Sequence, residues 1–143
     1  MSGIVSHSWY VTVPNPRPMF WSIAWFLWGP DPSFDSDGDA IPAASSSWTE
    51  LTLHLRDDRG RTISNQRVDV DPYSEDPLTL YIHSENPSLA LRTAYILAYH
   101  TGGKISDTSR ESFKDASEFA SMLGTEFDLP QALEHFHQAQ NRP

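Results

Sequence analysis

Apolar residues follow two different spacings along the chain, and these spacings predict both strands and helices. Trp9 to Val13 is rich in β-branched and aromatic side chains and is followed by three prolines, which predicts a first strand and a turn. Alternating apolar positions within Trp48–Arg56 and Ile63–Asp71 predict two further strands. The segment from Asp57 to Gly60 has the residue types that a tight turn needs, so we expect these two strands to form a hairpin.

Two long apolar segments predict helices. Met19–Trp28 is apolar on nearly every face and stops at a Gly-Pro pair, which predicts a buried helix. Leu78–Ile82 predicts another strand, and Asn86 precedes a helix with a broad apolar stripe that stops at a Gly-Gly pair. After that pair, Lys104–Ser106 predicts a short last strand.

The remaining segments predict an acidic loop and a helical tail. Residues 31–47 combine Asp, Gly, Pro and Ser without periodicity, which predicts an exposed connection. Ser112–Leu123 and Leu129–Gln140 have amphipathic helical patterns, and Asp128 is placed to cap the second of them.

This order of elements predicts one α+β domain over residues 1–143. We expect a two-layer sandwich, in which a mainly antiparallel sheet has helices packed on one face. This arrangement is a variant of the ferredoxin-like motif, with additional C-terminal helices. The pattern leaves the order of the strands in the sheet open.

The composition restricts the chemistry and the compartment. The 143 residues include no cysteine, so we expect neither disulfides nor thiolate metal ligands, and a reducing, cytoplasmic compartment suits the chain. The first residues lack the basic and long apolar regions of a secretory signal peptide. The longest apolar run has about half of the roughly 20 residues that span a bilayer, so we expect no membrane insertion.

Negative charge is concentrated in the middle of the chain. Residues 31–76 contain 11 acidic residues against four arginines, which accounts for −7 of the net charge of −9. Such a surface repels nucleic acids and anionic membranes, and either promotes solubility or attracts a basic protein. Phe34 and two of the candidates below, Trp48 and Tyr73, are aromatic residues at its edges that either anchor a partner or belong to the core. The candidate partner-binding residues are Asp35, Asp37, Asp39, Trp48, Glu50, Asp57, Asp58, Asp69, Asp71, Tyr73, Glu75 and Asp76.

Familiar catalytic and metal-binding patterns are absent from the sequence. The alternating carboxylates of Asp35 to Asp39 resemble the start of a calcium loop, but Ala40 and Ser46 stand where that loop needs Gly and Glu. His135 and His137 are two residues apart, so they point to different faces of a helix. The sequence contains no nucleophile elbow, dinucleotide-binding glycine motif or phosphate loop. We therefore expect no enzyme activity, no metal and no cofactor.

The stretch Leu78 to Ile105, LTLYIHSENPSLALRTAYILAYHTGGKI, resembles a strand, helix and Gly-Gly segment of small bacterial immunity proteins, which are encoded beside toxins. The resemblance covers about a fifth of the chain and carries no functional residue that can be transferred. It implies a non-enzymatic protein that occludes the active site of a basic toxin or effector domain acting in the cytoplasm.

Two other functions are compatible with the same sequence. One is an adaptor or inhibitor subunit of another protein, either a monomer or a homodimer formed through an exposed sheet edge. The other is a small hydrolase or isomerase in which His54 or His83 acts as the base.

Overall fold

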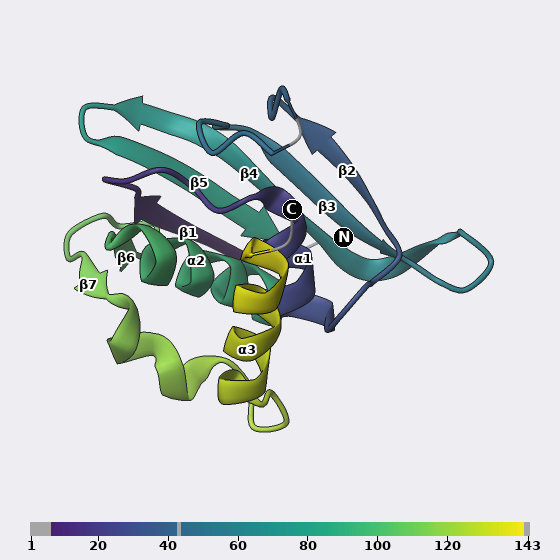
Figure 1. Ribbon diagram of the computed structural model, residues 1–143. Helices are drawn as coiled ribbons and strands as arrows, with labels where there is room; N and C mark the ends of the chain where they lie inside the picture. Colours follow the sequence, from purple (N-terminus) through teal and green to yellow (C-terminus); the bar gives the residue numbers. More distant parts are fainter. Residues whose placement is uncertain (1–6, 43, 142–143) are drawn as a thin grey trace, which may run out of the picture.

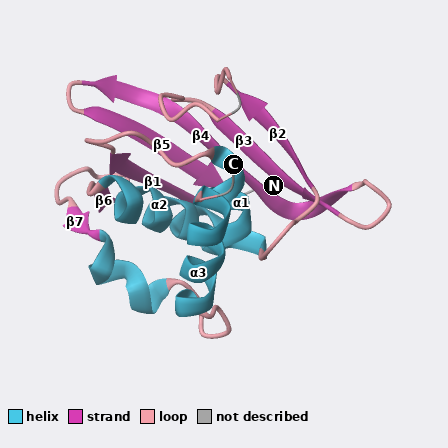
Figure 2. Ribbon diagram, in the orientation of Figure 1, coloured by secondary structure: helices cyan, strands magenta, loops and turns pink. Residues whose placement is uncertain are grey.

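A computed structural model describes residues 7–42 and 44–141 of the chain, so the start examined for a signal peptide lies largely outside the described residues. A seven-stranded antiparallel sheet forms one layer, and the helices lie together on one of its faces (Figures 1 and 2). The α+β sandwich expected from the sequence is confirmed. The elements in chain order are β1 (His7–Thr12), α1 (Phe20–Trp28), β2 (Phe34–Gly38), β3 (Leu51–Arg56), β4 (Thr62–Glu75), β5 (Leu78–Ser84), α2 (Pro87–Thr101), β6 (Lys104–Ser106), β7 (Lys114–Asp115), the 3₁₀ helix η1 (Ala116–Met122) and α3 (Leu129–Gln140).

The strand order is β2-β3-β4-β5-β1-β6-β7, with every neighbouring pair antiparallel. The four strands β4-β5-β1-β6, together with the crossover helices α1 and α2, form the split βαβ arrangement of a ferredoxin-like motif. The additional strands β2 and β3 extend the sheet beyond β4, and β7 extends it beyond β6. The sequence left the strand order open. The structure has the order of a ferredoxin-like motif at the centre of the sheet, with further strands at both edges.

Along each strand the side chains alternate between the two faces of the sheet, and one set points toward the helices. Val68 and Val70 on β4 and Leu80 and Ile82 on β5 are buried on this inner face, and Val11 on β1 joins them. The inner face of the sheet, α1 and α2 share one hydrophobic cluster, which α3 closes with Phe136 and Ala132. The opposite set of side chains is polar or aromatic.

The helix termini follow their predicted signals. The Asn86 side chain accepts hydrogen bonds from the backbone N–H groups of Ser88 and Leu89, and the Asp128 side chain accepts one from Gln131. Gly102 ends α2 in the left-handed conformation, with φ of 76°.

The prediction of an exposed loop over residues 31–47 is wrong in part, because Phe34–Gly38 forms the edge strand β2. Its Asp, Ser and Gly residues have low strand propensity, but an edge strand with one open side tolerates charged side chains and gains from them, since they discourage pairing with other chains. Strand β3 begins at Leu51, three residues later than expected.

Two further expectations need correction. Strand β4 continues to Glu75 through Pro72, where an irregularity in the pairing with β5 accommodates a residue that has no N–H group. Residues 112–123 were expected to form an amphipathic α-helix, but they contain the short strand β7 and the 3₁₀ helix η1. Ala116 and Phe119 are the buried residues of η1, and their spacing of three matches the 3₁₀ repeat.

Candidate functional site

The face of the sheet that points away from the helices is the candidate site, and we call it the open face. No helix among the described residues covers it (Figure 2). Its side chains alternate along each strand with those of the buried inner face. The open face is formed by Ser8 and Tyr10 of β1, Asp35 and Asp37 of β2, Thr52 and His54 of β3, Arg67, Asp69, Asp71 and Tyr73 of β4, and Tyr81 and His83 of β5.

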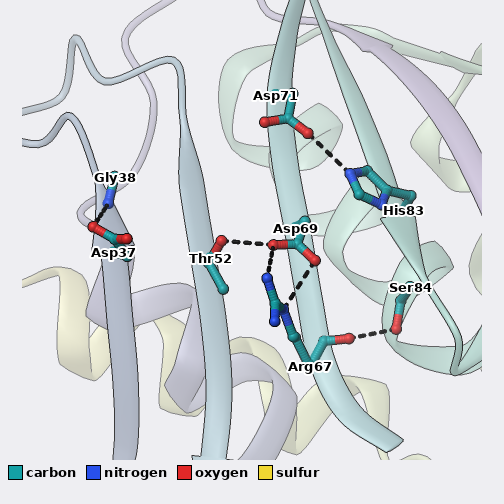
Figure 3. A network of polar contacts seen from close by, with 8 residues as sticks. All are labelled: Asp37, Gly38, Thr52, Arg67, Asp69, Asp71, His83 and Ser84. Atoms are coloured by element: carbon teal, nitrogen blue, oxygen red, sulfur yellow. Dashed lines mark hydrogen bonds and ion pairs between the residues drawn. The ribbon is translucent and has the colours of Figure 1, made fainter.

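A polar row crosses four strands of the open face. Asp37 lies opposite Thr52, Thr52 opposite Asp69, and Asp69 opposite His83. The Thr52 hydroxyl donates to Asp69 Oδ1 at 2.6 Å, and Arg67 donates to both oxygens of the same carboxylate at 3.1 Å (Figure 3). These hydrogen bonds raise the pKa of Arg67. Asp69 is therefore fixed and largely neutralised within the protein.

Four carboxylates lie around a hollow of about 350 Å³ at one end of the open face, and we call this the acidic hollow. Glu50 directly precedes Leu51, whose partner on β4 is Val70, so Glu50 and Asp71 come side by side. Among the described residues, no Lys, Arg or His nitrogen lies within 4.0 Å of the carboxylates of Asp37 or Glu50. The carboxylates of the hollow are those of Asp37, Asp39, Glu50 and Asp71.

Asp39 has a structural role within this group. Its carboxylate accepts hydrogen bonds from the N–H groups of Thr49 and Glu50, at 2.8 and 2.9 Å, and from the Thr49 hydroxyl at 2.9 Å. Desolvation acts to raise the pKa of Asp39, but these hydrogen bonds outweigh it and lower the pKa. Of the remaining carboxylates of the hollow, that of Asp71 contacts His83 and that of Asp37 accepts the N–H group of Gly38 (Figure 3).

Tyrosines adjoin the acidic hollow on the same face. The ring centroid of Tyr10 lies 4.6 Å from that of Tyr73 and 5.1 Å from that of Tyr81, and Tyr81 stacks on His83 at 5.1 Å. We call Tyr10, Tyr73 and Tyr81 the tyrosine cluster. Tyr73 is 46% exposed, so the cluster offers apolar area to solvent beside the carboxylates. Tyr10 and Tyr81 were not among the predicted binding residues, although they alternate with the buried residues of β1 and β5, which is a signal for this face.

His83 has a carboxylate partner. Its Nε2 atom is 2.9 Å from Asp71 Oδ2, and it borders a second hollow of about 200 Å³ lined in part by Arg67, Asp69 and Glu85. His54 instead uses Nε2 in a 3.0 Å contact with the carbonyl of Ile63. In the described part of the chain no hydroxyl is hydrogen-bonded to His83, so the described residues show no nucleophile paired with this histidine.

The structure brings only some of the predicted binding residues together. Asp57 and Asp58 lie at the tip of the β3–β4 hairpin, which extends beyond the other strands in Figure 1, and Glu75 and Asp76 lie at the opposite end of β4. The 14 residues of β4 separate these two ends, a span of roughly 43 Å. Asp57 also caps its own turn, because its carboxylate accepts the N–H groups of Arg59 and Arg61.

The aromatic candidates have different positions. Trp48 is only 1% exposed and belongs to the core, so the expectation that it contacts a partner is corrected. Phe34 is half-buried and packs against the core, close to Phe20 and Trp28. Tyr73 alone of the three is exposed on the open face.

The described residues include no group of three or more His, Asp or Glu side chains placed to hold a metal ion. Asp35 and Asp37 lie in strand β2, where Asp35 pairs with Arg56, and Asp39 follows the strand and accepts backbone N–H groups. No helix within residues 7–42 and 44–141 is both long and apolar enough to cross a membrane. Comparisons with protein-family models, curated proteins and solved structures found no match to this chain.

Proposed function

We propose that this protein binds a basic partner protein through the open face, and that it is an immunity protein which neutralises a cognate toxin domain by covering the basic cleft of that domain. One observation carries the proposal. Carboxylates from β2, β4 and the segment before β3 gather beside the tyrosine cluster on a sheet face that no described helix covers.

The charges of this face favour a protein partner with a positive surface. Asp35 and Asp69 have arginine partners, whereas Asp37 and Glu50 have no cation within ion-pair distance among the described residues. A basic surface would supply the missing counter-charges, accelerate association and select the correct partner. Tyrosines beside these charges provide the rigid, amphipathic contact area typical of binding hot spots.

The strands also favour binding by a preformed surface. Asp71, Tyr10 and Tyr81 lie on strands β4, β1 and β5, which are hydrogen-bonded on both sides, so these side chains hold their relative positions. A surface of this kind loses little conformational entropy when it binds, which favours tight inhibition of a toxin.

A second candidate function is a small hydrolase or isomerase, and the His83–Asp71 pair is the observation that favours it. A histidine hydrogen-bonded to a carboxylate is a common general base. The pair is open to solvent, however, with side-chain exposures of 30% for His83 and 53% for Asp71. We therefore favour binding, in which the same pair offers a partner one negative charge when His83 is neutral.

The test is isothermal titration calorimetry against the protein encoded by the adjacent gene, prepared as an inactive variant. The triple variant D37N/E50Q/D71N removes three exposed charges from the acidic hollow. The matched control D58N/E75Q/D76N removes three exposed charges from the ends of the sheet. Both variants change the net charge equally, so a difference between them reports position and not overall charge.

We expect the hollow variant to weaken binding by about tenfold or more and to flatten the salt dependence, and the control to change Kd by less than about twofold. Equal effects of the two variants would contradict a binding site on the open face. No binding by the unmodified protein would contradict the immunity function.

A further inference from the structure

An arginine of the protein itself lies over the tyrosine cluster. The Arg110 Cζ atom is 5.0 Å from the ring centroid of Tyr73 and 5.4 Å from that of Tyr10. Arg110 belongs to the connection between β6 and β7, which places it across the edge of the open face. The distances are those of cation–π contacts, in which the negative face of an aromatic ring attracts a guanidinium group.

The contact of Arg110 with the cluster is incomplete. Within the described residues, no carboxylate oxygen lies within 4.0 Å of the Arg110 guanidinium. Arg110 is exposed, and it has φ of 57°, a left-handed conformation that disfavours any residue with a Cβ atom. An exposed cation–π contact without an ion pair is weak, so Arg110 can leave the cluster at low cost.

A carboxylate lies in the same row as the tyrosines. Tyr10 on β1 is opposite Tyr81 on β5, and Tyr81 is opposite Asp71 on β4. Side chains opposite each other on neighbouring strands are about 5 Å apart at Cβ, so a guanidinium that lies closer to Tyr81 than Arg110 does comes within reach of Asp71, whose Oδ2 atom contacts His83. Such a cation makes an aromatic contact with the tyrosine cluster and also gains the ion pair that Arg110 lacks.

The geometry points to a binding site for an arginine side chain of the partner, made by the tyrosine cluster and Asp71, in which Arg110 is the occupant until the partner displaces it. This inference rests on the proposed function, since it names the group that the open face recognises. Arginine is favoured over lysine because a planar guanidinium stacks on an aromatic ring and at the same time donates a hydrogen bond to a neighbouring carboxylate.

The site is tested without the partner, by titrating protein labelled in its tyrosine rings with N-acetyl-L-arginine amide and following the ring signals by NMR. R110A removes the internal occupant. If Arg110 fills the site about two-thirds of the time, R110A binds the arginine amide about threefold more tightly than the unmodified protein does. N-acetyl-L-lysine amide is the matched ligand, and we expect it to bind R110A more weakly.

Y73A in the R110A background checks the position of the site, because Tyr73 is exposed and its loss leaves the core intact. We expect it to abolish the saturable shifts of the Tyr10 ring signal. Equal affinities of R110A and the unmodified protein, equal binding of the lysine amide, or unchanged binding by R110A/Y73A would each overturn the inference. A positive result with the arginine amide and none with the adjacent-gene protein would leave this site standing and reject the immunity function.

Discussion

Trp48 stabilises the fold through both its apolar area and its polar atoms. The indole Nε1 donates a 2.8 Å hydrogen bond to the carbonyl of Pro18, and the Trp48 carbonyl accepts one of 2.9 Å from Arg17 Nε. These bonds tie the segment before β3 to the segment before α1. A buried tryptophan whose ring N–H and carbonyl are both satisfied belongs to the core and not to a binding surface.

We predict that Trp48→Phe lowers the free energy of unfolding by about 2 kcal/mol, because it leaves a gap in the core and removes the hydrogen bond to Pro18. Urea unfolding followed by circular dichroism measures the loss. Trp28→Phe is the control, since Trp28 is half-buried and donates to the Gln66 side chain, and it should lose less. Equal losses at the two positions would contradict the core role of Trp48.

Aspartates close together in sequence have different roles on this molecule. Asp37 lines the acidic hollow, Asp39 holds the backbone before β3, and Asp69 is bound by Arg67 and Thr52. Composition reveals that carboxylates are abundant in this region. Only the strand register and the hydrogen bonds show which of them, such as Asp39 and Asp69, are bound within the protein. For this reason the sequence identified the acidic region but did not locate the site within it.

At the scale of elements, α2 and α3 meet through an aromatic contact that includes a histidine. His100, near the end of α2, lies edge-on to Phe136 with a centroid separation of 5.5 Å. Desolvation lowers the pKa of His100, and the nearby His137 lowers it further. The folded protein therefore binds a proton at His100 less readily than the unfolded chain does.

We predict a loss of stability below neutral pH from this contact. As the pH falls through about 6.5, where an unperturbed histidine titrates, the unfolded chain gains a proton that folded His100 resists, so the free energy of unfolding decreases. His100→Gln should reduce this decrease between pH 8 and pH 5.5, as measured by thermal unfolding. An undiminished pH dependence in His100→Gln would show that His100 does not contribute.

The sequence predicts elements well where their side chains obey one clear period. The caps at Asn86 and Asp128 and the apolar stripe of α2 are local signals, and all three are present in the structure. Strand β2 was missed because its pairing with β3, and not its own propensity, determines its conformation. The continuation of β4 through Pro72 was missed for a related reason, since the irregular pairing with β5 becomes visible only when the two strands are aligned.

At the scale of the whole molecule, the two faces of the sheet differ in composition and in what they contact. The inner face and the helices form the core, and the open face gathers carboxylates and tyrosines that the core does not need. Of the other predicted binding residues, Asp57 and Asp58 lie at the β3–β4 turn and Glu75 and Asp76 at the far end of β4, where they contribute to the general negative potential. We therefore predict that the partner contacts the open face and leaves both ends of β4 free.

Carboxylate footprinting of the complex tests this claim most directly. In this measurement a carbodiimide labels exposed carboxylates, and mass spectrometry compares their reactivity with and without the adjacent-gene protein. We predict protection of Asp37, Glu50 and Asp71, with unchanged labelling of Asp58 and Asp76. Protection of Asp58 and Asp76, or of carboxylates on the helical side, with the acidic hollow still reactive would contradict binding through the open face.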